Sequence, residues 1–261
     1  MDIQQHIRRS IHSNQLSTAI GLLFLVLTLS CGNIASTKTY PPLSGPYVHD
    51  DYAPPMRNSP TIAFGKTDVT AHPKSAHSLM CLGLAYYKQK QYSQAVNAFN
   101  ISLAIKPTNI NCWLYLGCSY RATGELSKAR DSFAQGAKRS SERVRRSFFS
   151  GLEGDAAWDI GDQASAHEAY KRVLADRPND GLALIFEAQF AATNGDNDRA
   201  KTLFERASIN NQDSPRNRAI EYAGLGRLWE QDGNQPRARN YFEKSLKVDA
   251  TNAWALHGLK N

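Results

Sequence analysis

What this 261-residue sequence lacks excludes several functional classes. Its four cysteines include no CxxC pair and lie near no cluster of histidines, so neither a disulfide-stapled scaffold nor a zinc site is expected. It contains no HExxH, GxGxxG or P-loop sequence. A nucleophile needs a base within hydrogen-bond reach, and no such arrangement can be recognised. We therefore expect no enzyme activity, no metal site and no cofactor.

The sequence also lacks a strong charge excess and a long hydrophobic run. Its 31 basic and 24 acidic residues give a net charge of +7, so no nucleic-acid partner is expected. The content of 41% hydrophobic and 21% charged residues is close to globular averages and excludes wholesale disorder. The apolar run from Ala19 to Leu29 is much shorter than the roughly 20 residues that span a bilayer as a helix.

That apolar run, preceded by a basic segment, has the properties of a secretory signal. It ends in Leu29-Ser30-Cys31-Gly32, which resembles the lipobox of bacterial lipoproteins. The resemblance implies that residues 1–30 are a signal peptide, that Cys31 is acylated, and that Gly32 directs the protein to the periplasmic face of the outer membrane. A signal anchor, or an ordinary signal peptide with an incidental cysteine, is the alternative.

Residues 31–75 are expected to form a lipid-anchored, proline-rich linker. Seven of the eleven prolines lie there, and no helical or strand period is sustained, so an extended tether is predicted. Its aromatic residues leave open a docking epitope instead of a plain spacer; they are Tyr40, Tyr47, Tyr52 and Phe64.

Beyond the linker, the sequence repeats itself with a period near 34 residues. The second unit shows the pattern most fully, with Trp113, Leu116-Gly117, Tyr120, a turn at Gly124, Ala129 and Phe133. This resembles the tetratricopeptide repeat, with its Trp-x2-Leu-Gly-x2-Tyr pattern, glycine turn and Ala-x3-Phe. Aligning this motif along the chain sets the repeat frame. It predicts a domain over 76–261, with repeats at 76–109, 110–143, 147–180, 181–214 and 219–252 and a capping helix at 253–261.

The residues themselves support an all-α fold. Each unit holds two segments with apolar positions at i, i+3, i+4 and i+7, as in amphipathic helices. One unit cannot bury its apolar face alone, so a right-handed superhelix of five repeats plus a partial sixth helix is predicted. We expect the extra residues before the third and fifth units to form loops at 140–146 and 215–218. The third and fourth units carry Glu153 and Glu187 where leucine is usual, and should pack less well.

Other features allow more than one interpretation. Cys81, Cys112 and Cys118 fit small buried residues, although a disulfide from Cys81 to one of the other two is an alternative. The basic run at 138–146 fits a solvated helix end, or a contact with anionic lipid headgroups or an acidic partner.

The resemblance also implies a binding groove on the concave face, lined by fixed positions of each first helix. In this frame the groove would be apolar with a few charges, which suits a peptide or an amphipathic helix of a protein partner. The predicted partner-binding residues are Met80, Leu84, Tyr87, Leu114, Arg121, Phe148, Asp155, Trp158, Leu182, Ile185 and Arg227.

Two functional hypotheses follow. The first is a non-catalytic scaffold lipoprotein, similar to those that assist pilus or secretion assembly, with a secretin or pilus component as partner and the lipid anchor in the membrane. The alternative is an adaptor lipoprotein that recruits peptidoglycan enzymes. An enzyme is disfavoured because no site can be recognised.

Overall fold

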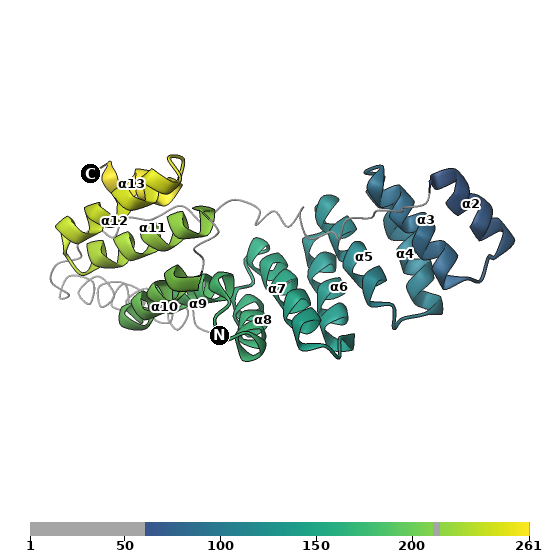
Figure 1. Ribbon diagram of the computed structural model, residues 1–261, viewed down its shortest axis with the longest axis horizontal. Coiled ribbons are helices and arrows are strands. Elements are labelled where there is room, and N and C mark those ends of the chain that lie inside the picture. The colour runs from purple at the N-terminus through teal and green to yellow at the C-terminus, as the bar shows by residue number, and fades with distance from the viewer. Residues whose placement is uncertain (1–60, 211–214, 261) are drawn as a thin grey trace, which may run out of the picture. The chain divides into compact units, whose positions relative to one another are not determined.

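The computed structural model describes residues 61–210 and 215–260, which form twelve α-helices and no strand (Figure 1). The all-α fold expected from the repeats is therefore confirmed for these residues. The helices are α2 (Ile62–Ala71), α3 (Ala76–Lys88), α4 (Tyr92–Ile105), α5 (Ile110–Ala122), α6 (Leu126–Arg139), α7 (Arg143–Asp159), α8 (Gln163–Asp176), α9 (Gly181–Thr193), α10 (Asn197–Asn210), α11 (Pro215–Gln231), α12 (Gln235–Val248) and α13 (Ala253–Leu259).

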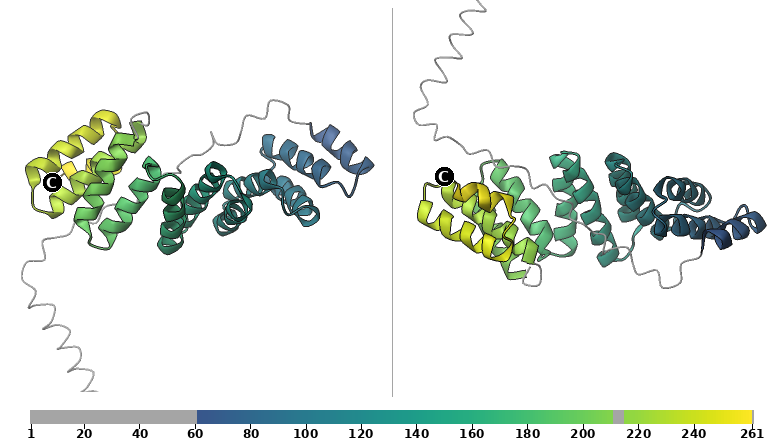
Figure 2. Two further views of the ribbon diagram at one scale, coloured as in Figure 1. Left: turned by 60° about the horizontal axis from the view of Figure 1, so that its bottom comes forward. Right: turned by 90° about the horizontal axis from the view of Figure 1, so that it is seen from above.

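Each helix packs mainly against the helices that precede and follow it in the chain. The pairs α3–α4, α5–α6, α7–α8, α9–α10 and α11–α12 form five helical hairpins, and each hairpin contacts the next. The views in Figure 2 also show consecutive hairpins side by side. This stacking of like units is the arrangement of a repeat solenoid, in which contacts between neighbours bury the apolar faces.

The hairpin turns follow from the local sequence. Gly124 and Gly161 have φ of +80° and +79°, a conformation that side chains with a Cβ rarely adopt, and glycines end the first helices of the last two hairpins in the same way. The following helix is often capped by a polar side chain. At α8, for example, Asp162 accepts a hydrogen bond from the Ser165 amide.

One aromatic ring from the second helix of each hairpin fills the core. Four of these rings pack against a glycine of the first helix of the same hairpin: a Cβ added at Gly83 would lie 2.6 Å from the Phe99 ring, and one at Gly117 would lie 2.4 Å from the Phe133 ring. Phe204 instead packs against Gly224 of the following helix, α11. The glycine and aromatic positions of the repeat motif therefore pack against each other. The rings, all almost fully buried, are Phe99, Phe133, Tyr170, Phe204 and Phe242.

The structure corrects the placement of the two insertions. We expected loops at 140–146 and 215–218, but α7 begins at Arg143 and α11 begins at Pro215. Each insertion adds one turn to the start of a first helix, so α7 and α11 have 17 residues. Arg146 explains the gain at α7, because its Nε and Nη2 atoms bind both carboxylate oxygens of Asp176 at 2.9 and 2.5 Å.

The linker prediction also needs correction at its end. Residues 62–71 were expected to be extended, but they form α2, which packs on α3 and is capped by the Thr61 side chain. Gly65 is buried and allows the close approach: a Cβ there would lie 3.0 Å from the Leu82 backbone. Phe64, by contrast, is exposed.

Several predictions fall outside the described residues. These are the signal peptide at 1–30, the acylated Cys31, and the tether up to residue 60 with Tyr40, Tyr47 and Tyr52. In the part of the chain that the structure covers, no helix combines the length and apolarity needed to cross a bilayer. No disulfide joins Cys81, Cys112 and Cys118 among the described residues, and Cys112 is buried.

Candidate functional site

The candidate site is the first-helix surface, by which we mean the side chains of α3, α5, α7, α9 and α11 at the predicted groove positions. Eight of the eleven predicted residues are half-buried, so they combine packing with an accessible face. Leu114, Asp155 and Ile185 are instead buried, at 6, 2 and 0% exposure, so their side chains belong to the core between repeats.

At the α3 end this surface is apolar and aromatic. The Tyr87 ring makes edge contacts with Tyr92 and Tyr115, with ring centres 5.5 and 5.4 Å apart. Met80 and Leu84 pack against the same core, and Asn109 Nδ2 donates a 3.0 Å hydrogen bond to the Met80 sulfur. Burial raises the pKa of Tyr115 to about 12, so its hydroxyl is neutral and its ring serves as packing.

The middle of the surface contains one ion pair and two more aromatic residues. Arg121 of α5 donates through Nη2 to Asp159 of α7 at 3.0 Å. Burial raises the pKa of Asp159, and the Arg121 cation opposes that rise. Trp158 contacts Phe186 edge-on at 5.2 Å between ring centres. Phe148 and Leu182 are half-buried against the adjoining cores.

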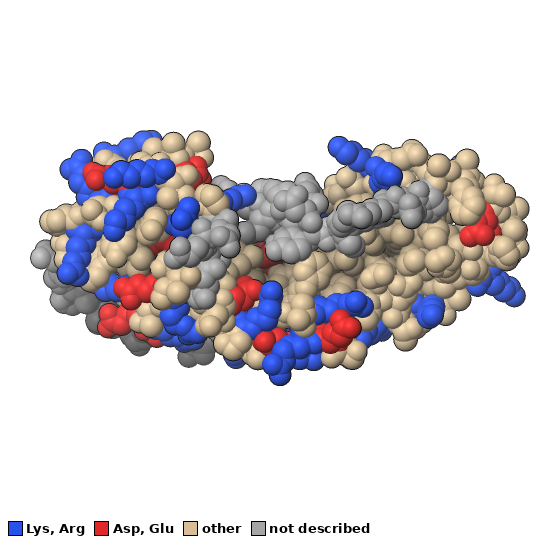
Figure 3. Space-filling view, viewed as in Figure 1, with Lys and Arg blue, Asp and Glu red and all other residues tan. Residues whose placement is uncertain are grey.

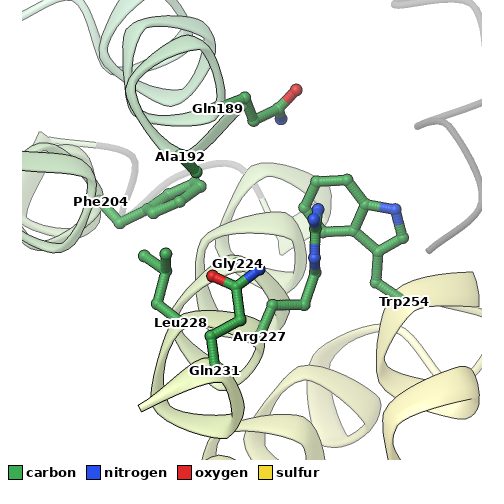
Figure 4. Close-up of a pocket in the computed structure, with 8 residues that line it drawn as sticks. All are labelled: Gln189, Ala192, Phe204, Gly224, Arg227, Leu228, Gln231 and Trp254. Atoms are coloured by element: carbon green, nitrogen blue, oxygen red, sulfur yellow. The ribbon is translucent and has the colours of Figure 1, made fainter. Parts of the chain in front are cut away.

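At the α11 end the surface contains a pocket (Figure 4). The Arg227 guanidinium lies over the Trp254 ring of α13, 4.3 Å from its centre, and Trp254 is itself only 4% exposed. Ala192, Phe204, Gly224 and Leu228 provide an apolar lining, and Gln189 and Gln231 provide amides.

Gln189 is the most unusual of these groups. It is 6% exposed, and its Nε2 atom has no hydrogen-bond partner among the described residues. A buried amide nitrogen without an acceptor costs about 1–3 kcal/mol, and buried polar groups are rarely left so. In Figure 4 the Gln189, Arg227 and Gln231 side chains surround one space. The pocket can therefore accept a hydrogen-bond acceptor beside an apolar group.

Of the residues around the pocket, Arg227 was predicted from the repeat pattern, whereas Gln189, Gln231 and Trp254 were not. The signal for the two glutamines was present, because they occupy the groove positions of the fourth and fifth units in the same frame. Trp254 also occupies such a position, as the second residue of the capping helix, but the groove positions were applied to the five complete repeats alone. Within the described ranges, no group of three His, Cys, Asp or Glu side chains is placed to hold a metal ion.

Comparison with known proteins identifies the repeats. Residues 76–109, 152–215 and 187–253 match the tetratricopeptide repeat, together more than half of the chain. No curated protein matches the sequence.

Solved structures share the fold. YrrB, described as a TPR protein with an unusual peptide-binding site, is 15% identical with a TM-score of 0.61, covering 76% of this chain and 98% of YrrB. A MamA structure is 20% identical with a TM-score of 0.58, covering 69% and 95%. PilF of Pseudomonas aeruginosa is 13% identical with a TM-score of 0.58, covering 74% and 85%.

These findings define a helical repeat protein of the protein-interaction scaffold type. The chain belongs to the tetratricopeptide-repeat family. At these identities the solved structures support the fold alone.

Proposed function

We propose that this chain is a non-catalytic scaffold that binds a segment of a protein partner on its first-helix surface. We further propose that an acylated Cys31 holds it at the periplasmic face of the outer membrane, where it assists assembly of a pilus or secretion complex. The pocket at α9, α11 and α13 is the observation that carries the binding proposal.

The pocket supports a protein ligand because of its chemistry. The unpartnered Gln189 amide offers a hydrogen bond to a main-chain carbonyl, and the adjoining Ala192, Phe204 and Leu228 offer apolar contact. An extended or helical segment presents both kinds of group at close spacing. The aromatic residues at the α3 end, Tyr87 above all, would contact the rest of the segment.

The assembly role is proposed from the sequence resemblance. A secretin or a pilus assembly component is the partner that the resemblance suggests. PilF of Pseudomonas aeruginosa has the same fold, which is compatible with this role, although its 13% identity carries no functional argument.

Site-specific crosslinking tests the binding surface. A photoreactive residue replaces Gln231, which is exposed and lines the pocket, in the full chain expressed in its host cells. The matched control carries it at Lys244, an exposed position on α12. We expect one defined crosslinked protein from position 231 and none from position 244. The same products from both positions, or none from 231, would contradict the proposal.

Substitutions then separate binding from packing. Tyr87→Ala and Trp158→Ala each remove an aromatic contact, and a true interface anchor costs ~2 kcal/mol or more, which is about a thirtyfold loss of affinity. We expect weaker crosslinking from position 231 while circular dichroism shows an intact helical fold. If the captured protein is a peptidoglycan enzyme, the adaptor function replaces the assembly role.

The anchor has its own test. Cys31→Ala should move the protein from the membrane fraction to the soluble periplasmic fraction, because an acyl anchor needs that thiol. Membrane fractionation that does not change on substitution would refute acylation without affecting the binding proposal.

A further inference from the structure

The turns that precede the first helix of each hairpin lie along one side of the repeat array, which we call the inter-repeat edge. It consists of the turns at 72–75, 106–109, 140–142 and 177–180 with the adjoining helix ends. Successive helices are joined by short turns and run antiparallel, so the turns before α3, α5, α7 and α9 fall at the same end of the array. The turns within hairpins fall at the opposite end.

Side-chain contacts join the parts of this edge. The Ser102 hydroxyl, near the end of α4, donates to the Ala76 carbonyl at the start of α3 at 2.7 Å. Trp113 Nε1 donates to the Pro107 carbonyl at 2.8 Å, and the Arg139 guanidinium lies 5.1 Å from the centre of the same Trp113 ring. Consecutive turns therefore form one continuous surface.

Exposed cations gather on the edge between α3 and α7. Lys74, Lys106 and Lys138 are exposed, and none of them pairs with an acidic side chain of the described residues. Arg143 is 73% exposed and only 3.8 Å from Asp176, a weak contact, and Arg145 is 48% exposed. Figure 3 shows Lys and Arg at the margins of the visible face over α3–α6, with a largely uncharged area between.

The acidic groups near this edge offset only part of the charge. Asp176 and Asp180 are 10% and 17% exposed and are paired with arginines. Glu142, which is 69% exposed, is the exposed acidic residue on the inter-repeat edge between α3 and α7. The opposite edge differs, because its cations are largely paired: Glu125, Asp162 and Asp232 in the turns within hairpins bind Lys128, Arg130 and Lys201 of the adjoining helices.

Exposed aliphatic side chains lie beside these cations. Ile105, 45% exposed, is the last residue of α4 and precedes Lys106. Val144, 68% exposed, lies between Arg143 and Arg145 at the start of α7. Single exposed apolar residues are common and need no explanation, but their position among exposed cations does.

We propose that the inter-repeat edge between α3 and α7 binds the surface of a membrane rich in anionic phospholipid. Long lysine side chains act as separate point charges and suit a diffuse anionic surface, whereas a defined carboxylate or phosphate is better held by an arginine fork. Aliphatic groups among the cations would enter the boundary between headgroups and acyl chains. This inference rests on neither the groove nor acylation of Cys31.

The test uses the full chain carrying Cys31→Ala, so that no acyl group contributes. Its binding to vesicles of phosphatidylcholine alone and of phosphatidylcholine with phosphatidylglycerol is measured by co-sedimentation. Each surface cation contributes about 1 kcal/mol, or roughly fivefold, at an anionic membrane. We expect Lys106→Gln with Lys138→Gln to weaken binding to the anionic vesicles roughly tenfold or more.

A matched double variant removes the same charge from the opposite edge. Lys88→Gln with Lys90→Gln should leave binding nearly unchanged, because both residues lie at a turn within a hairpin. Any contribution of the segment Ala19–Leu29 is the same in every variant. Equal losses in the two double variants would show a general charge effect and overturn the proposal, as would no loss in either.

The aliphatic residues provide a second measurement. Ile105→Ser with Val144→Ser should weaken binding to anionic vesicles without changing the charge or the helical content. Polyglutamate serves as the probe for an acidic protein partner. If the Lys106→Gln, Lys138→Gln variant loses polyglutamate binding but retains vesicle binding, the edge is a protein site and the lipid proposal is wrong.

Discussion

The Tyr170 hydroxyl donates a 2.7 Å hydrogen bond to Oδ1 of Asp155, and both side chains are almost completely buried. The Tyr170 ring also stacks on Phe186 of the next hairpin, with 4.1 Å between ring centres. Gly154 leaves room for the ring, since a Cβ there would lie 2.8 Å from it. One tyrosine thus links α7, α8 and α9 through a polar and an aromatic contact.

Removing this hydroxyl should destabilise the repeats. Tyr170→Phe keeps the ring but takes a donor from the buried Asp155 carboxylate, and such a loss costs about 1–3 kcal/mol. Urea unfolding followed by circular dichroism measures it. The control is Tyr86→Phe, since Tyr86 is half-buried and no hydrogen bond of its hydroxyl is found within the described residues. Equal midpoints for the two variants would show that the Tyr170–Asp155 bond contributes nothing.

Two glycines of adjacent helices should respond to alanine in opposite directions. A Cβ at Gly136 of α6 would lie 2.2 Å from the Phe149 ring of α7, so Gly136→Ala should cost about 1–3 kcal/mol through overpacking. A Cβ at Gly151 of α7 would meet nothing within 4 Å. Gly151→Ala should therefore raise stability by up to about 1 kcal/mol, because alanine is the better helix former. Thermal unfolding of both variants gives the comparison, and a loss at both positions would contradict it.

The sequence predicted the repeats well because the repeat period is a local property. Three first helices begin at the predicted residues Ala76, Ile110 and Gly181. The starts of α7 and α11 were missed because polar and basic residues suit a loop as well as a helix. What selects the helix at α7 is the bond from Arg146 to Asp176, and a partner 30 residues away does not show in the local pattern.

The candidate site was less predictable because accessibility depends on the neighbouring hairpin. The groove positions of the family predict which face of each first helix points toward the groove. They do not predict whether a neighbouring helix covers that face, and Asp155 and Ile185 are buried in this way. The glutamates of the third and fourth units also have partners that the pattern does not reveal. Glu187 contacts His167 Nδ1 at 2.6 Å and Arg199 at 3.6 Å.

The pairing of Glu153 gives a prediction with a definite pH dependence. Arg172 binds the Glu153 carboxylate at 2.7 Å, yet burial dominates and raises the pKa of Glu153 above its ordinary value of 4.5. A raised carboxyl pKa means that folding favours the protonated form. Its contribution to stability is therefore fully present below pH 4.5 and is lost as the pH rises through the folded-state pKa.

Glu153→Gln removes this pH dependence, because the amide does not titrate. The stability of the variant relative to the natural protein should accordingly increase between about pH 4 and pH 7. Glu168→Gln is the opposite case: a hydrogen bond from Lys171 lowers the pKa of Glu168, so that variant should lose relative stability as the pH rises. Urea unfolding of the three proteins at both pH values measures the two differences. If Glu153→Gln instead loses relative stability at the higher pH, attraction to Arg172 outweighs the cost of burial and the assigned direction is wrong.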